Sequence, residues 1–282
     1  LDGANGDEID GMTVNYNWDL YYSTIRHYQP DALIANMGPD VRWIGNEDGL
    51  AEEMEWCIQP KIFSLQPTFG GDNNVWFPSE CDVSIRPGWF YHSSEDQQVK
   101  SADALKDIYL KSVGRNSNLL LNVPPNKDGL ISNYDIAVLK QWKDLIDNMF
   151  SKDIFYQKKI ESSNTRNKLE GYSEKNCLDN NRETFWVTDK NVLSAELIIN
   201  LDKKEKINMI RLEEAIEYGQ RIKLYSLYFE NNGQWEKFYG GSTVGRSRIL
   251  TFNTIETTRV KITIEDSYAS PTVRTINAYY SN

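Results

Sequence analysis

The sequence has 282 residues, 40% of them hydrophobic, which is long enough for about two domains with cores of their own. A formal net charge of −10 argues against nucleic acid and anionic membranes as partners, because both carry phosphate groups that repel an acidic protein. No apolar run is long enough to span a membrane as a helix, and two histidines, His27 and His92, are too few for a metal site built from several histidines.

The first 150 residues alternate apolar runs with amphipathic helical patterns, which is typical of parallel β/α units. NYNWDLYYSTIRHY at 15–28 predicts a helix, and ALIAN at 32–36 predicts a buried strand after it. A second helix is predicted over 101–114, and the apolar run at 119–123 predicts the next buried strand. A third helix is predicted over 133–150, where apolar residues recur at helical spacing.

Beyond about residue 155 the pattern changes to strands. ELIINL at 196–201 and VKITIE at 260–265 alternate apolar and polar residues, so each predicts a strand with one buried face. Turns are predicted at 231–233 and 240–241, at spacings typical of a β-sandwich.

The predicted fold class is therefore α/β plus all-β. The domain boundary is expected in the polar stretch near 152–162, which gives a β/α domain over 1–155 and a β-sandwich over 156–282. Cys57, Cys81 and Cys177 are far apart, so neither a zinc site nor a disulfide framework is indicated.

Two carboxylates stand where a β/α fold places function. Asp2 in LDGANG and Glu47 in WIGNEDG each follow apolar residues and precede a glycine that lets the chain turn, as on the loops after strands. A retaining glycosidase needs two carboxylates about 5 Å apart, one as nucleophile and one as acid and then base. The alternative is that both are ordinary turn residues, because Asp-Gly is common in turns.

A second candidate segment is WFPSECDVSIRPGWFYH at 76–92. It gathers Glu80, Arg86 and Trp89 with other charged and aromatic residues in a segment with two prolines, a concentration that is rare in a plain structural loop. The alternative is an ion pair between Arg86 and Asp82 that merely holds the loop.

Four motifs in chain order resemble the α-L-fucosidases of glycoside hydrolase family 29, namely LDGANG, MGPDVRWIGNEDG at 37–49, ECDVSIRPGWFYH at 80–92 and NLLLNVPPNKDG at 118–129. They look closest to the branch that acts on α-1,3- and α-1,4-linked fucose. The resemblance covers nearly all of 1–150. It implies the second half of a (β/α)8 TIM barrel, with LDGANG at the end of roughly the fourth strand.

The resemblance implies that Asp2 is the nucleophile and Glu47 the acid/base. It also implies several barrel strands before the nucleophile, which this sequence does not contain. Either the chain is a C-terminal fragment, or a separate polypeptide supplies the N-terminal half of the barrel. Half a barrel leaves open sheet edges, which lowers the expected stability and activity of the chain alone.

The resemblance further implies that Glu80, Arg86 and Trp89 line or support the sugar pocket. An aromatic face suits the apolar side of a fucose ring. Trp43 and Trp56 are further candidates for this site or for the neighbouring sugar, with ordinary packing as the alternative.

Residues 160–282 resemble a discoidin-type, jelly-roll β-sandwich, similar to carbohydrate-binding modules of family 32 and to coagulation-factor C domains. The residues that carry this likeness are CLDNNRETFW at 177–186, INLDKKEKINMIRLEE at 199–214 and YGQRIKLYSLYF at 218–229. Such domains bind sugars in many proteins, and some hold calcium. The alternative is a structural companion of the barrel.

The sequence thus predicts a retaining exo-α-L-fucosidase that removes terminal α-1,3- or α-1,4-linked fucose from oligosaccharides or glycoconjugates through a covalent fucosyl-enzyme. No cofactor is expected for the chemistry, and calcium is a candidate ligand of the sandwich alone. The alternatives are a carbohydrate-binding protein without catalysis and a retaining glycosidase for a related sugar such as galactose. The resemblance implies a secreted or periplasmic protein.

Overall fold

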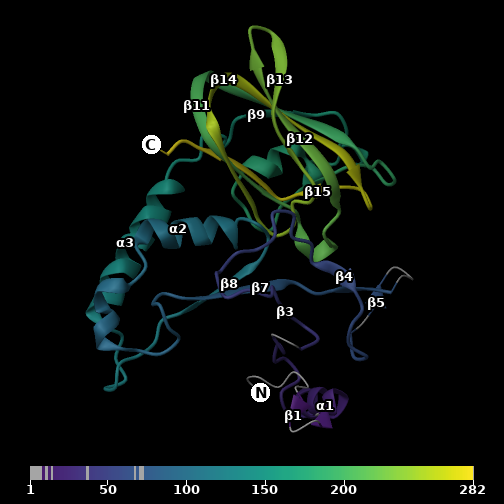
Figure 1. Cartoon of the computed structure of the whole chain (residues 1–282). Helices are drawn as coiled ribbons and strands as arrows, with labels where there is room; N and C mark the ends of the chain where they lie inside the picture. The colour runs from purple at the N-terminus through teal and green to yellow at the C-terminus, as the bar shows by residue number, and fades with distance from the viewer. Residues whose placement is uncertain are drawn as a thin grey trace. The chain divides into compact units, whose positions relative to one another are not determined.

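The computed structural model describes residues 8–9, 12–13, 15–35, 38–66, 68–69 and 73–281 (Figure 1). The chain divides into two compact units, one formed by Leu1–Trp43 with Ile58–Pro78 and the other by Ile44–Cys57 with Ser79–Asn282. Within the described ranges, no helix combines the length and the apolar character of a membrane span.

The first unit has short elements, namely β1 (Glu8–Ile9), β2 (Met12–Thr13), α1 (Trp18–Tyr28), β3 (Arg42–Trp43), β4 (Ile58–Pro60), β5 (Thr68–Phe69) and β6 (Asn74–Trp76). Helix α1 begins after Asn17, whose side chain accepts the backbone N–H of Leu20 as an N-cap. The buried Tyr22 of α1 packs edge-on against Phe63, and Phe63 packs in the same way against Phe77. A row of aromatic side chains thus links α1 to the segments around Phe63 and Phe77 within this unit.

The strand predicted at 32–36 is wrong for residues 32–35, and residue 36 lies outside the described residues. The N–H of Ile34 donates to Oδ2 of Asp40 at 2.6 Å, and the carbonyl of Ile34 accepts the N–H groups of Asp40 and Val41 at 3.2 and 3.3 Å. Local turn bonds therefore occupy backbone groups that a strand would pair with a neighbour. Leu33 is largely exposed as a result of this path.

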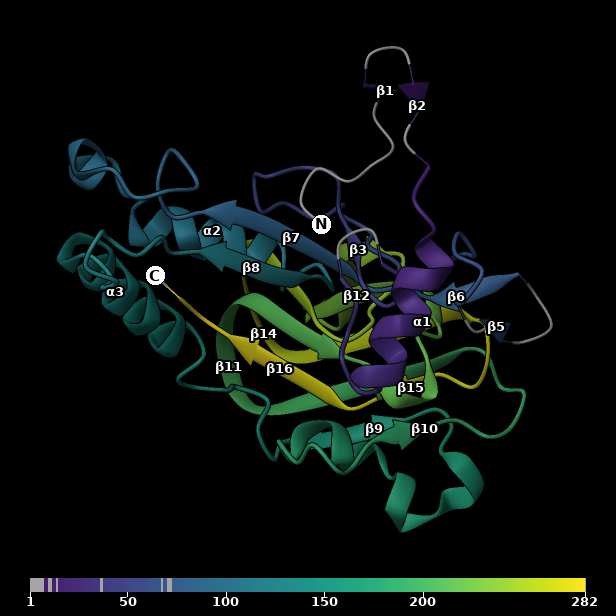
Figure 2. The same cartoon turned by 90° about the horizontal axis from the view of Figure 1, so that it is seen from below.

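The second unit begins with a parallel β/α arrangement, made of β7 (Ser79–Ser84), the 3-10 helix η1 (Ser93–Gln98), α2 (Ala102–Lys111), β8 (Asn118–Asn122) and α3 (Asn133–Met149). Strands β7 and β8 are parallel neighbours, and α2 lies between them in the chain, as Figure 2 shows. The side chains of Ser101 and Ser132 cap α2 and α3. The predictions of two helices and one strand in this region are confirmed to within a few residues at their ends.

The all-β part contains β9 (Lys159–Ser162), β10 (Trp186–Val187), β11 (Ala195–Glu213), β12 (Ile222–Asn231), β13 (Gln234–Gly241), β14 (Arg248–Ser267), β15 (Thr272–Val273) and β16 (Thr275–Tyr279). Four 3-10 helices join them, η2 (Arg166–Lys168), η3 (Glu170–Tyr172), η4 (Glu174–Leu178) and η5 (Ile216–Tyr218). The strand order of the large sheet is β13-β12-β14-β11-β16, with β9 also paired to β11.

Strands β11 and β14 each run through both layers of the sandwich. Their register shifts between Asn200 and Glu205, where the pair bends. Before the bend, β11 pairs with β9, and β12 pairs with the last part of β14. After the bend, β11 pairs with β16. One folded sheet thus makes two layers around a core that contains Trp186, Leu197 and Ile276.

The predicted inward faces are confirmed. Leu197 and Ile199 on β11, and Val260 and Ile264 on β14, are almost completely buried, as strict alternation requires.

The hairpin turn predicted at 231–233 is also confirmed. Asn232 and Gly233 both have positive φ, 51° and 82°, which matches the right-handed twist of the flanking strands β12 and β13. The turn predicted at 240–241 is wrong, because Gly240 and Gly241 belong to β13 and pair with Ser226 and Tyr225. A Cβ on Gly241 would lie 3.1 Å from Cε of Met54 and 3.2 Å from the Tyr225 hydroxyl oxygen. Glycine is used here for close packing rather than for a turn.

Glu214 is a buried carboxyl group at the end of the first long strand. Its Oε1 accepts the N–H groups of Arg221 and Ile222 at 2.7 and 2.9 Å, and its Oε2 accepts the N–H of Gly245 at 2.7 Å. Burial raises the pKa of Glu214 to about 7 from 4.5, against the lowering effect of these N–H groups. The folded state therefore binds this proton more tightly than the unfolded state does.

We expect Glu214 to make the protein less stable as pH rises from 4.5 to 7, because its folded pKa lies above the unfolded value. The free energy of unfolding of the wild type, relative to Glu214→Gln, should fall by about 3 kcal/mol over this window. Denaturant unfolding of both proteins at a series of pH values measures this difference. Parallel pH profiles would contradict it.

Candidate functional site

Strands β7 and β8 turn one face toward the helices and one away from them. Val83 packs with Leu105 of α2 in a buried cluster. Because side chains alternate along a strand, Glu80, Asp82 and Ser84 point to the other face of β7, which is the polar one.

The segment that carries Glu47 runs alongside β7. The N–H of Ile44 donates to the carbonyl of Glu80 at 3.0 Å, and the N–H of Gly49 donates to the carbonyl of Asp82 at 3.0 Å. Glu47, between these two bonds, has an exposed side chain.

Trp89 is the candidate site residue that the structure brings to Glu47. Its indole Nε1–H donates a hydrogen bond to Oε2 of Glu47 at 3.1 Å. The tryptophan is 36% exposed, so the pair is accessible to solvent. A hydrogen bond to one carboxylate oxygen restricts the rotation of the group and so orients it.

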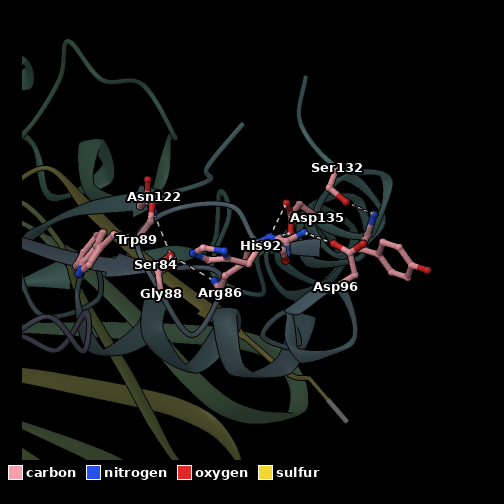
Figure 3. Close-up of polar contacts among 10 residues, drawn as sticks. Ser84, Arg86, Gly88, Trp89, His92, Asp96, Asn122, Ser132 and Asp135 are labelled. Atoms are coloured by element: carbon pink, nitrogen blue, oxygen red, sulfur yellow. Dashed lines mark hydrogen bonds and ion pairs between the residues drawn. The ribbon is translucent and has the colours of Figure 1, made fainter. Parts of the chain in front are cut away.

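Asn122 and Ser84 hold the loop that carries Trp89 (Figure 3). Nδ2 of Asn122, at the end of β8, donates to the carbonyl of Trp89 at 2.9 Å and to Oγ of Ser84 at 3.0 Å. Ser84, at the end of β7, donates to the carbonyl of Gly88 at 2.7 Å. The loop is therefore fixed at the C-terminal ends of two parallel strands, where β/α folds place their functional residues.

Arg86 lies inside the protein, with a side chain that is 0% exposed. Its Nε donates to both carboxylate oxygens of Asp135 at 3.1 Å, its Nη2 to Asp96 at 2.8 Å and its Nη1 to the carbonyl of His92 at 3.2 Å, as Figure 3 shows. Burial lowers the pKa of Arg86, but Asp96 and Asp135 outweigh it and raise the pKa overall. Arg86 thus ties the loop after β7 to η1 and to the first turn of α3.

Glu80 lies half-buried near the start of β7. Burial and then the nearby Asp82 carboxylate raise the pKa of Glu80 above its ordinary value. Both side chains lie on the polar face of the strand, so like charges are close to each other there.

The remaining predicted site residues are Asp2, Trp43 and Trp56. Asp2 lies outside the described residues. Trp43 belongs to the first unit and is 38% exposed. Trp56 packs edge-on against Tyr268 of the sandwich at a ring distance of 5.8 Å. The sugar-binding roles predicted for these tryptophans stay predictions.

Gly49 has φ +73°, and a Cβ there would lie 2.8 Å from Cγ2 of Ile108 and 2.9 Å from Cγ1 of Val83. We expect Gly49→Ala to lower the free energy of unfolding by about 3 kcal/mol, because it strains the backbone and overpacks the core. Gly45→Ala is the matched control, since Gly45 also has positive φ but no atom within 4 Å of its Cβ position. Its loss should be about 1 kcal/mol. Equal losses in denaturant unfolding would contradict the overpacking.

Sequence reasoning missed the residues that hold this site. Arg86 forms ion pairs with Asp135 and Asp96, whereas the sequence suggests Asp82 as its partner. Asn122 belongs to the motif at 118–129. It directly follows three apolar residues at the end of a strand, and this position is the signal that indicates a functional residue there.

Among the described residues, no three His, Cys, Asp or Glu side chains gather where they could hold a metal ion. Calcium in the sandwich stays a prediction. Cys57, Cys81 and Cys177 are all buried.

Family profiles match two parts of the chain. The α-L-fucosidase profile matches residues 69–148, which contain β7, α2, β8 and all but the last residue of α3. The F5/8 type C domain profile matches residues 159–276, which contain most of the sandwich.

Whole proteins of the same family are also similar to this chain. Alpha-L-fucosidase 1 of Arabidopsis thaliana is 37% identical over 99% of this chain and 57% of its own length. A GH29 fucosidase of Ruminococcus gnavus, solved in complex with fucose, is 27% identical, with a TM-score of 0.85 over 98% of this chain and 60% of that one. A glycoside hydrolase 29 family member from an unknown rumen bacterium is 31% identical, with a TM-score of 0.77 over 100% of this chain and 50% of that one.

The chain therefore spans 50–60% of the length of these relatives. The parallel β/α unit and the folded sheet confirm the predicted fold class, a partial (β/α)8 barrel followed by a discoidin-like β-sandwich. The chain thus carries part of an α-L-fucosidase domain of glycoside hydrolase family 29, followed by an F5/8 type C domain.

Proposed function

We propose that this chain supplies the acid/base side of an exo-α-L-fucosidase site that removes terminal fucose from oligosaccharides or glycoconjugates. The observation that carries the proposal is the Glu47 carboxylate, which Trp89 orients beside strands of an α-L-fucosidase family domain. The α-L-fucosidase relative from Arabidopsis and the fucose complex of the Ruminococcus enzyme support fucose as the sugar.

The proposed reaction is retaining and uses two carboxylates. Asp2 attacks the anomeric carbon while Glu47 donates a proton to the leaving oxygen, so that a fucosyl ester forms on Asp2 and an alcohol leaves. Glu47 then removes a proton from water, which attacks the same carbon and releases fucose and the Asp2 carboxylate. Each carboxylate returns to its starting protonation state, so the cycle balances without a cofactor.

The roles of the neighbouring side chains follow from their contacts. Trp89 restricts the Glu47 carboxylate and presents an accessible aromatic ring beside it. Arg86 keeps the Trp89 loop in place through its bonds to Asp96 and Asp135. Burial and the nearby Asp82 raise the pKa of Glu80, so this carboxyl group on the same face of the sheet holds its proton more readily than a free glutamate does.

We also propose that the preferred linkages are α-1,3 and α-1,4, and that the N-terminal half of the barrel completes the site. A secreted or periplasmic location fits substrates of this kind. Rates of fucose release from α-1,2-, α-1,3- and α-1,4-linked oligosaccharides test the linkage preference directly. Equal rates on all three would overturn it.

An activated 2-deoxy-2-fluoro fucoside tests the mechanism, because the fluorine slows the hydrolysis of the covalent intermediate and lets it accumulate. The test uses two proteins, the 282-residue chain and a longer polypeptide in which this chain replaces the matching part of the Arabidopsis relative. Intact mass spectrometry should show one fucosyl adduct, and peptide mapping should place it on Asp2. The Asp2→Ala variant should not be labelled.

The outcomes separate the alternatives. An adduct on another carboxylate would overturn the role of Asp2 but keep a retaining mechanism. Fucose binding by calorimetry without an adduct or fucose release in either protein would favour a carbohydrate-binding protein. Faster release of galactose than of fucose would change the sugar.

A further inference from the structure

The segment Ala51–Cys57 continues directly from the segment that carries Glu47, and side chains from elsewhere bind its backbone at several points. Nη1 of Arg115 donates to the carbonyl of Ala51 at 2.8 Å, and Nη1 of Arg248 donates to the carbonyl of Glu53. These bonds fix the backbone of this segment, which has no regular secondary structure.

The side-chain amide of Gln220 binds the C-terminal end of the same segment through both its oxygen and its nitrogen. Its Oε1 accepts the N–H of Cys57 at 2.8 Å, and its Nε2 donates to the carbonyl of Glu55 at 3.3 Å and also to Oγ1 of Thr243. Gln220 is 1% exposed, so these bonds are shielded from water.

Arg248 and Gln220 both belong to the sandwich, and both are fixed by it. Nη2 of Arg248 donates to the hydroxyl of Tyr239 at 3.1 Å, and the arginine is 3% exposed. A buried guanidinium whose donors bind backbone and hydroxyl oxygens holds its position firmly, because each broken bond would leave a buried polar group without a partner.

A loop of the β/α part joins the same network. Nδ2 of Asn116 donates to the carbonyl of Glu55 at 3.0 Å, and its Oδ1 accepts the N–H of Arg246 at 2.6 Å. Gly245 packs so closely on this amide that a Cβ would lie 2.4 Å from it. The β/α loop, the segment Ala51–Cys57 and the sandwich thus form one hydrogen-bonded junction.

We propose that Arg248 and Gln220 of the sandwich are positioning residues for the Glu47 carboxylate. They hold the backbone of Ala51–Cys57 and thereby fix where the Glu47 segment lies along β7. The inference rests on the acid/base role proposed for Glu47. It means that residues of the sandwich help to position a catalytic group, beyond any purely structural role of this domain.

The physical reason is the short span between the two parts. Three residues separate Ala51 from Glu47. The N–H of Gly49 donates to Asp82 at 3.0 Å and the N–H of Ala51 donates to Lys111 at 2.9 Å, so the chain between them has little freedom to move. A shift of the segment by about 1 Å at a reacting group costs up to about 100-fold in rate. The hydrogen bond from Trp89 to Glu47 would sense the same shift.

The experiment compares Arg248→Gln and Gln220→Met with two matched controls, Arg259→Gln and Gln234→Met. Arg259 lies on the same strand as Arg248, but it binds Asn200 and Glu230, away from the junction. Gln234 is an exposed residue at the start of β13. Circular dichroism and thermal melting identify the variants that fold. If Arg248→Gln does not fold, the test is made with Gln220→Met alone.

The first readout is kinetic. An alkyl fucoside has a poor leaving group that must be protonated by the acid, whereas dinitrophenolate leaves as a stable anion without a proton. Loss of acid positioning should therefore slow the cleavage of the alkyl fucoside selectively. We expect kcat/KM on the alkyl substrate to fall about tenfold or more, and that on the dinitrophenyl substrate to stay within about twofold. Equal losses on both substrates, or no loss on either, would overturn the proposal.

The second readout does not need activity. The indole ¹H–¹⁵N signal of Trp89, assigned by its absence in Trp89→Phe, reports the contact with Glu47. It should move in Arg248→Gln and Gln220→Met and stay in both controls, and an unmoved signal in the folded variants would overturn the proposal. Both readouts use the longer polypeptide in which this chain replaces the matching part of the Arabidopsis relative. If that wild-type polypeptide releases no fucose but shows this pattern, the proposed function is refuted and the positioning is kept.

Discussion

Replacing Glu47 by alanine is expected to lower kcat/KM on alkyl fucosides by about 10²- to 10⁴-fold, the usual contribution of a positioned acid/base. The reason is that the alkoxide leaving group no longer receives a proton in the first step. On a dinitrophenyl fucoside the first step should proceed nearly as before, while kcat falls because no base activates water in the second step. Steady-state kinetics on the two substrates measure this contrast.

Azide provides the rescue that a structural defect cannot imitate. As a small anionic nucleophile it needs no general base, so it should raise kcat of Glu47→Ala on the dinitrophenyl substrate and yield a fucosyl azide. Glu52→Ala, an exposed carboxylate five residues further along the chain, is the matched control and should behave like the wild type. A Glu47→Ala protein with undiminished activity on alkyl fucosides would remove Glu47 from the mechanism.

Replacing Asp135 by alanine is expected to lower the free energy of unfolding by about 3–5 kcal/mol, because it leaves the Arg86 guanidinium buried with only part of its partners. Both side chains of the Arg86–Asp135 pair are 0% exposed, so water cannot take the place of the carboxylate. Denaturant unfolding followed by tryptophan fluorescence measures the loss. The Trp89 loop should loosen as well, because Arg86 anchors it.

The same helix offers the control for this prediction. Asp147 of α3 pairs with Lys143, and both side chains are well exposed, at 59% and 70%. Asp147→Ala should therefore change the free energy of unfolding by about 0.5 kcal/mol or less. Comparable losses in the two variants would show that the buried pair has no special weight.

The sequence predicted α2, α3 and β8 well because several local signals agreed there. Each helix has apolar residues at helical spacing and a serine cap, Gly114 follows α2, and Pro124 follows β8. The apolar run at 32–36 had no such agreement, and the bonds that Asp40 makes to Ile34 decide the local path. At 240–241 the pair of glycines pointed to a turn, but packing against Tyr225 explains it.

The sequence predicts which residues carry the chemistry of the candidate site, but it does not predict which residues hold them in place. Glu47 and Trp89 were found because each stands in a motif with glycine or proline nearby, although the motifs did not show that the two touch. The partners of Arg86 lie 10 and 49 residues away, and Gln220 contacts Cys57 across 163 residues. No local spacing encodes such pairs, because the folded sheet and the ends of the helices bring them together.

The passage of β11 and β14 through both layers has a consequence for the mechanics of the sandwich. Two layers joined by flexible loops can slide or separate while their backbones stay intact, but here the ladder between β11 and β14 continues on both sides of the bend. Each layer therefore keeps its own part of this ladder, and a single proteolytic cut at the exposed residues 202–204 would leave both pieces of β11 paired to β14, which would still join the two layers.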